Sequence, residues 1–91
     1  MRTNWRRENE ILVGILNRRT GSPEQGWVTN DKGERVSNPG HYYIGYAYGQ
    51  PRLERMASDC GAAANISPRW SARELNRWLL GYLSAVDNLI S

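Results

Sequence analysis

Thiols, imidazoles and long apolar runs are all scarce in this sequence. Of its 91 residues, one is cysteine, one is histidine and none is phenylalanine. A single thiol, Cys60, cannot form an internal disulfide, and metal sites need several Cys, His, Asp or Glu side chains at ligand spacing. The longest apolar run, residues 11–16, is far below the ~20 residues that span a bilayer. We therefore expect no metal, no cofactor and no membrane span. Because the N-terminal segment also lacks the apolar run of a secretion signal, we expect a cytoplasmic location.

Reactive side chains are scattered along the chain. The carboxylates form no closely spaced pair for acid–base work, and the glycines open no helix as a phosphate-binding loop would. His41 and Cys60 are the one combination of base and nucleophile, but no helix start or basic cluster near Cys60 would activate its thiol. We expect His41 to be an ordinary exposed residue and Cys60 a small buried or turn residue. The sequence thus predicts a protein that is not an enzyme.

The net charge of +3 comes from one end of the chain. Residues 1–20 hold five arginines and two glutamates, whereas the remainder carries seven basic and seven acidic residues. This excess is too small for a dedicated DNA clamp, but it biases contact toward phosphate groups or an acidic protein. Arginines near an aromatic ring can hold phosphate and stack on a base, and the alternative is a solvated helix face. The candidate binding residues of this segment are Trp5, Arg6, Arg7, Arg18 and Arg19.

Residues 71–90 predict an amphipathic helix. Ser71 and Glu74 have the spacing of a capping box, and apolar residues then recur every three or four positions. The apolar stripe consists of Leu75, Trp78, Leu79, Tyr82, Leu83, Val86, Leu89 and Ile90. A stripe this wide must cover another apolar surface. Gly81 and Ala85 leave a low spot on the helix that permits close approach of another backbone, including that of a second copy in a homodimer.

Residues 41–67 predict the sheet that this helix covers. Between 41 and 48, one face carries Tyr42, Ile44, Tyr46 and Tyr48, and the other carries Tyr43, Gly45, Ala47 and Gly49. Residues 49–51 predict a turn, residues 52–57 the returning strand, and residues 62–67 a short third strand. The alternation leaves open whether the helix settles over the glycine face or packs on the tyrosine row. We expect most of the row in the core and one tyrosine at the rim. Tyr46, Tyr48 and Arg52 are therefore candidate binding residues, since Tyr and Arg are frequent in interface hot spots.

The first 40 residues predict a second helix and a connection. Residues 4–19 fit a helix capped by Asn4 and followed by the stop signals Gly21 and Pro23. The β-branched alternation at 11, 13 and 15 argues for a strand instead, but a strand would leave residues 4–10 unassigned. Residues 21–40 suggest a connection with a small hairpin around Asn30–Gly33. The expected fold is one α+β domain over residues 1–91: a basic helix (1–20), the connection (21–40), about three antiparallel strands (41–67) and a covering helix (71–90).

Part of the chain resembles a known group of proteins. Residues 43–49 read YIGYAYG and are followed by Arg52-Leu53-x-Arg55, a glycine, Ser67-x-Arg69, Glu74-Leu75 and Trp78-Leu79. Residues 40–86 in this way resemble small uncharacterised accessory proteins of temperate phages and prophages. The resemblance implies a phage accessory gene expressed in the bacterial cytoplasm, and it carries over no catalytic residue.

The chain is small, its sequence shows no reactive constellation, and the resemblance implies a phage setting. These three points lead to one functional hypothesis and one alternative. The hypothesis is a non-enzymatic protein that binds and modulates or inhibits a bacterial protein complex, of the anti-CRISPR or host-nuclease inhibitor type. A small inhibitor needs only a compact scaffold and one contact surface of about 800 Å². The alternative is a small nucleic-acid-binding protein that uses the N-terminal Arg/Trp segment.

Overall fold

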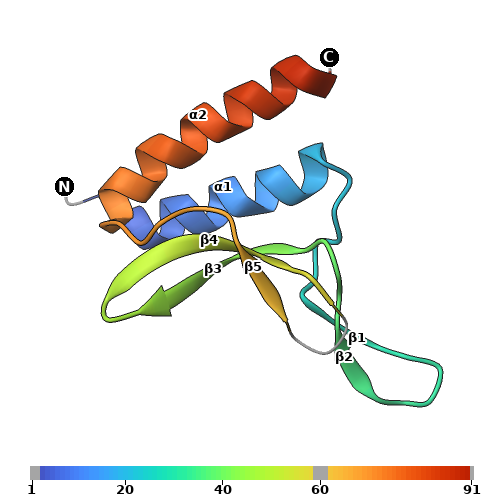
Figure 1. The fold of residues 1–91 in the computed structure, drawn as a ribbon. Coiled ribbons are helices and arrows are strands. Elements are labelled where there is room, and N and C mark those ends of the chain that lie inside the picture. Colours follow the sequence, from blue (N-terminus) through green and yellow to red (C-terminus); the bar gives the residue numbers. More distant parts are fainter. Residues whose placement is uncertain (1–2, 59–61, 91) are drawn as a thin grey trace.

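A computed structural model describes residues 3–58 and 62–90 (Figure 1). Helices α1 (Trp5–Arg19) and α2 (Ala72–Ile90) lie side by side and pack on a three-stranded antiparallel sheet, α1 on β3 and α2 on β4. The sheet has the order β3 (Tyr42–Ala47), β4 (Gln50–Met56) and β5 (Ala63–Asn65). A separate hairpin of β1 (Trp27–Thr29) and β2 (Arg35–Ser37) projects away from the sheet. The predicted α+β class and the three-stranded sheet are confirmed.

Both helices begin at the predicted caps. The Glu74 N–H donates to the Ser71 hydroxyl oxygen over 3.2 Å, and the Ser71 hydroxyl donates to the Glu74 carboxylate over 2.9 Å. At α1, the Arg7 N–H donates to the Asn4 side-chain oxygen over 3.1 Å. Residues 11–15 lie inside α1, so the strand alternative is wrong. The helix forms because the whole capped segment of 15 residues can be helical, and the alternating residues 11–15 are only a part of it.

The tyrosine side of β3 is the buried one. Tyr42 and Ile44 pack with Leu53 of β4 against the helices, in a core that also contains Leu16 and Leu79. The glycine face of β3, which contains Gly45, is the opposite face of the sheet, and neither α1 nor α2 packs on it. Instead, the Glu54 carboxylate lies over Gly45, where a Cβ atom on residue 45 would collide with it. The alternation was therefore informative about the two faces, and packing against α1 and α2 selects between them.

Two details of the hairpin differ from the sequence prediction. The turn is Tyr48-Gly49, and Gln50 and Pro51 already belong to β4, paired with Ala47 and Tyr46. The Pro51 carbonyl points away from β3 and accepts the Trp70 N–H over 3.3 Å. In a strand the nitrogen of a residue points to the same side as its carbonyl, so the ring nitrogen of Pro51 also points away from β3. No hydrogen bond between β3 and β4 is lost, and the proline is tolerated. Most of the tyrosine row was expected in the core, and this is wrong: Tyr46 is 41% exposed and Tyr48 is 99% exposed.

The remaining predictions along the chain have mixed outcomes. The small hairpin is confirmed, and the Asn30 side chain accepts the N–H groups of Lys32 and Glu34 at its turn. At Gly81 there is open space around the position of a Cβ atom, so no other segment of the described chain approaches it closely. Cys60 lies outside the described residues.

Candidate functional site

The β3–β4 turn displays an exposed aromatic side chain. Tyr48 and Gly49 are the two residues between the paired ends of the strands, and both have positive φ angles, 54° and 73°. This is the backbone of a type I′ hairpin turn, in which Asn-Gly is the favoured sequence. A tyrosine at the first position is held in a left-handed conformation that side chains other than Asn and Asp rarely adopt. The turn thus presents a fully exposed ring on a rigid hairpin.

Beside this turn, Tyr46 connects β3 to the first turns of α1. The Arg6 guanidinium lies over the Tyr46 ring at 4.4 Å from its centroid, and the Tyr46 hydroxyl donates to the Glu10 carboxylate over 3.1 Å. Burial raises the pKa of Tyr46 above its usual value, and the Glu10 carboxylate raises it further while Arg6 opposes the rise. The phenol therefore keeps its proton at neutral pH and remains a hydrogen-bond donor.

We name this surface the tyrosine patch: Arg6, Glu10, Tyr46 and Tyr48. It combines two partly or fully exposed phenol rings with one cation and one carboxylate, all on a helix, a strand and a two-residue turn. Such a surface offers stacking, hydrogen bonds and charge to a partner, and it has no group arranged to attack a substrate. Glu10 was not predicted, although its spacing of four residues from Arg6 places both on one side of α1.

The other predicted binding residues lie elsewhere. Trp5 is half-buried and Arg7 is exposed, both in the first turn of α1. Arg18 and Arg19 lie at the far end of the helix, where they approach Glu24 at 3.9 Å and Asp87 at 2.9 Å. The N-terminal arginines therefore do not form one basic patch, because local acidic side chains partly neutralise those at the C-terminal end of α1.

Arg52 lies on the sheet face that the helices leave uncovered. Its Nε atom lies 3.5 Å from the Glu54 carboxylate. This Nε atom is buried and makes no hydrogen bond, so the contact is an ion pair with poor hydrogen-bond alignment. Tyr43 donates its hydroxyl to the same carboxylate over 3.3 Å. Burial raises the pKa of Tyr43, and Glu54 adds to the rise. Arg52 thus belongs to a structural group over Gly45 and is separate from the tyrosine patch.

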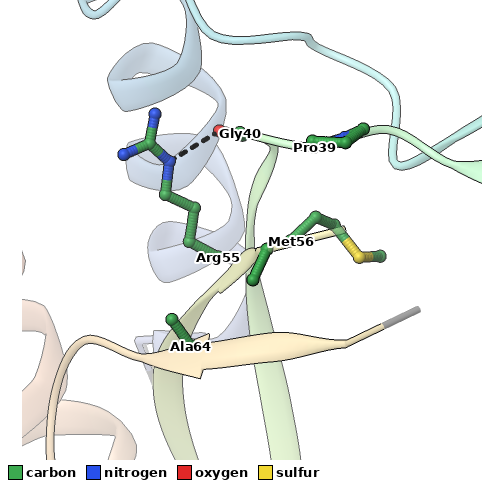
Figure 2. Close-up of a pocket in the computed structure, with 6 residues that line it drawn as sticks. Pro39, Gly40, Arg55, Met56 and Ala64 are labelled. Atoms are coloured by element: carbon green, nitrogen blue, oxygen red, sulfur yellow. Dashed lines mark hydrogen bonds between the residues drawn. The ribbon is translucent and has the colours of Figure 1, made fainter. Parts of the chain in front are cut away.

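Two open cavities flank the end of the sheet near the β1–β2 hairpin. One, of about 450 Å³, is lined by Pro39, Gly40, Arg55, Met56, Ala57 and Ala64 (Figure 2). There Arg55 donates from Nε to the Gly40 carbonyl over 3.2 Å and lies 4.9 Å from the centroid of the Tyr42 ring. The described part of the lining holds one cation and no nucleophile or carboxylate, so these residues provide no acid–base pair.

The other cavity, of about 420 Å³, includes His41 beside Tyr43 and Trp27. His41 Nδ1 lies 2.8 Å from the Pro23 carbonyl oxygen, and its ring stacks on Tyr43 with centroids 6.2 Å apart. His41 is half-buried and hydrogen-bonded, so the prediction of an ordinary exposed residue is wrong. Its suggested pairing with Cys60 falls outside the described residues.

The described residues also bear on metal binding and on membrane insertion. Among residues 3–58 and 62–90, no three His, Cys, Asp or Glu side chains gather closely enough to hold a metal ion. Neither described helix has both the length and the apolar character needed to cross a bilayer. These findings leave the tyrosine patch as the best-defined candidate surface. Comparison of the chain with protein-family models, with curated proteins and with solved structures finds no match in any of the three.

Proposed function

We propose that this protein is a non-enzymatic binding protein that docks on a bacterial protein complex and modulates or inhibits it. The observation that carries the proposal is Tyr48, whose ring is 99% exposed and whose backbone is left-handed. Asparagine or glycine would fit the turn at lower cost. Since the fold gains nothing from this ring, we assign it to contact with a partner.

The neighbours of Tyr48 support a protein partner. Tyrosine and arginine supply a large share of interface hot spots, and Tyr46 and Arg6 stack on each other next to the turn. The Tyr46–Glu10 hydrogen bond restrains both side chains before any partner arrives, which lowers the entropy lost on binding. The setting in the bacterial cytoplasm, and the anti-CRISPR or nuclease-inhibitor type of activity, rest on the resemblance to phage accessory proteins.

The test is quantitative affinity capture from bacterial lysate with three tagged proteins: wild type, Tyr48→Asn and Lys32→Ala. Asparagine suits the turn, so Tyr48→Asn removes the ring without disturbing the fold. Lys32 is an exposed residue of the other hairpin turn and serves as the matched control. A hot-spot tyrosine is worth about 2 kcal/mol or more, so capture of one stoichiometric partner falls by more than about tenfold for Tyr48→Asn only. Equal capture by all three proteins would place the binding surface elsewhere, and no captured protein would remove the proposal.

Nucleic-acid binding through the N-terminal arginines is the alternative outcome of the same experiment. Arg6 and Arg7 would contact phosphate groups, whereas the ion pairs of Arg18 and Arg19 reduce what the far end of α1 can add. This alternative predicts purified protein that shifts DNA or RNA with an affinity falling steeply with salt. It also predicts marked weakening by Arg6→Ala combined with Arg7→Ala. Binding that is flat across salt would exclude it.

A further inference from the structure

Strand β5 has a free edge. Along β4 and β5, the Ile66 N–H donates to the Leu53 carbonyl and the Ala57 N–H donates to the Ala62 carbonyl, and the register pairs Arg55 with Ala64. Because hydrogen-bonded and non-hydrogen-bonded pairs alternate in an antiparallel ladder, the N–H and C=O groups of Ala63 and Asn65 point away from β4. All three residues of β5 are exposed. Within the described chain, no hydrogen bond is made to these outward groups.

The opposite edge of the sheet is protected. On β3, the outward N–H and C=O of Tyr42 are both bonded by the Asn17 side chain, at 2.8 and 3.0 Å. The next outward residue, Ile44, is only 8% exposed. Natural proteins protect sheet edges because an unprotected edge is a template for another strand. The sheet can therefore be extended at β5 and not at Tyr42 and Ile44 of β3.

The helical layer is wider than the sheet beneath it. Two packed helices about 9 Å apart cover roughly four strands spaced at about 4.8 Å, and this sheet has three. Trp78, Tyr82 and Leu89 share one side of α2, and helical spacing places this side roughly opposite Asp87, which pairs with Arg19 of α1. Trp78 and Tyr82 are half-buried against the core and stack with centroids 4.9 Å apart, and Leu89 is 85% exposed. Trp70, which precedes α2, approaches Trp78 at 6.0 Å. An added strand at β5 would be covered by this apolar side.

We propose that the free edge of β5 pairs with β5 of a second copy of this chain, about a two-fold axis at Ala64. Antiparallel pairing then places Ala63 opposite Asn65 of the second copy, and both residues have their backbone groups directed outward. Each such pair exchanges two hydrogen bonds. The strand has no charged side chain, so self-pairing opposes no like charges, and two alanines meet at the axis without steric conflict.

The two edges also limit the assembly to two copies. A sheet with two open edges would add strands without end, whereas pairing through β5 consumes the free edge and leaves the β3 edge of each copy outermost. The product is a continuous six-stranded sheet with two helices from each copy on the same face. The apolar sides of the two α2 helices then face each other above the paired strands.

The first experiment measures mass in solution by sedimentation equilibrium. A pairing this short predicts a Kd on the order of micromolar, so the chain is examined at roughly 100 µM. We expect wild type at twice the 10.4 kDa mass of the chain. Asn65→Pro removes an outward N–H that β4 does not use, which an edge strand tolerates, and is expected to be monomeric. Asn65→Thr keeps the N–H and is expected to remain dimeric. Circular dichroism checks that both variants are folded.

The second experiment tests the register, and it does not depend on a proline. Ala64 of the two copies form a non-hydrogen-bonded pair with Cα atoms about 4.5 Å apart, within the range that a disulfide bridges. Ala64→Cys in a Cys60→Ser background should therefore form a covalent dimer under mild oxidation. Ala63→Cys in the same background should not, because its two copies are two residues apart along the strands, which puts their Cα atoms roughly 8–9 Å apart, beyond disulfide reach.

Each result has a defined meaning. A monomeric wild type, or a dimer that persists in Asn65→Pro, would overturn the proposal, and so would equal cross-linking of both cysteine variants. If the β5 edge instead binds an extended peptide from another protein, the purified chain should be monomeric, and Asn65→Pro should have the same mass in solution. The inference is independent of the proposed function, because β5 pairs with Glu54–Met56, at the end of β4 away from the Tyr48 turn. Failure of one therefore leaves the other standing.

Discussion

Asn17 gives the backbone of Tyr42 the two hydrogen bonds that a neighbouring strand would give. Its Oδ1 accepts the Tyr42 N–H over 2.8 Å, and its Nδ2 donates to the Tyr42 carbonyl over 3.0 Å. Asn17 lies in the last turns of α1 and is almost fully buried. One amide thus attaches the helix to the sheet and closes the edge of β3 at its first residue. Replacement by an apolar residue leaves two buried backbone groups without partners.

Removing the Asn17 amide should destabilise the protein strongly. Each unpaired buried backbone group costs about 1–3 kcal/mol, so loss of both partners in Asn17→Ala is expected to lower the unfolding free energy by about 2–6 kcal/mol. Asn88→Ala is the matched control, because it makes the same change of helix propensity at an exposed position of α2. Urea unfolding of the three proteins measures the difference. Equal stability of the two variants would show that the Tyr42 backbone finds other partners.

Gly45 should tolerate no side chain while Glu54 is present. A Cβ atom at position 45 would occupy the place of the Glu54 carboxylate, which is held by Tyr43 and Arg52. Gly45→Ala is therefore expected to cost about 1–2 kcal/mol by displacing that carboxylate. In a Glu54→Ala background the same change should cost close to nothing. A double-mutant cycle by urea unfolding then yields a coupling energy of about 1–2 kcal/mol between positions 45 and 54, and additive effects would refute the contact.

Helix and strand positions followed from local patterns, because capping and periodicity act over a few residues. The Ser71–Glu74 box and the alternation from Tyr42 to Ala47 are signals of this kind. The sequence predicted most of the tyrosine row in the core and one tyrosine at the rim, whereas Tyr46 and Tyr48 are both exposed.

What escaped prediction depends on contacts between distant segments. Asn17 is polar, and its burial becomes intelligible only when the edge of β3 lies beside α1. The Tyr48-Gly49 turn was displaced toward Pro51 in the prediction, since the direction of the Pro51 nitrogen depends on strand register. Arg52 was predicted as a binding residue together with Tyr46 and Tyr48, although the alternation of β4 places it on the uncovered face.

Tyr48→Asn should make the protein more stable. The turn holds residue 48 at a φ of 54°, where asparagine is favoured and tyrosine is strained. We expect the unfolding free energy to rise by about 0.5–1 kcal/mol in Tyr48→Asn. A β-branched residue suits this conformation least, so Tyr48→Val is expected to be less stable than wild type. Urea unfolding measures both, and a loss of stability in Tyr48→Asn would mean that the ring has a structural role.

Alkaline pH should unfold the protein partly through Tyr43. Burial, and then Glu54, raise the pKa of this phenol in the folded chain, whereas in the unfolded chain it titrates near the usual value of about 10. A raised folded pKa means that the folded state binds more protons. Its stabilising contribution is therefore complete below about pH 10 and is lost as the pH rises through the folded pKa.

The Tyr43 variants separate the two causes of this shift. Tyr43→Phe should make the alkaline fall in unfolding free energy shallower, because the titrating group is gone. Glu54→Gln should make it only partly shallower, since burial is the larger cause and remains. Thermal unfolding between neutral and strongly alkaline pH measures the slopes. Burial also raises the pKa of Tyr46 and Tyr82, so a residual slope is expected in both variants. A slope in Tyr43→Phe as steep as in wild type would show that titration of Tyr43 does not contribute to the alkaline loss of stability.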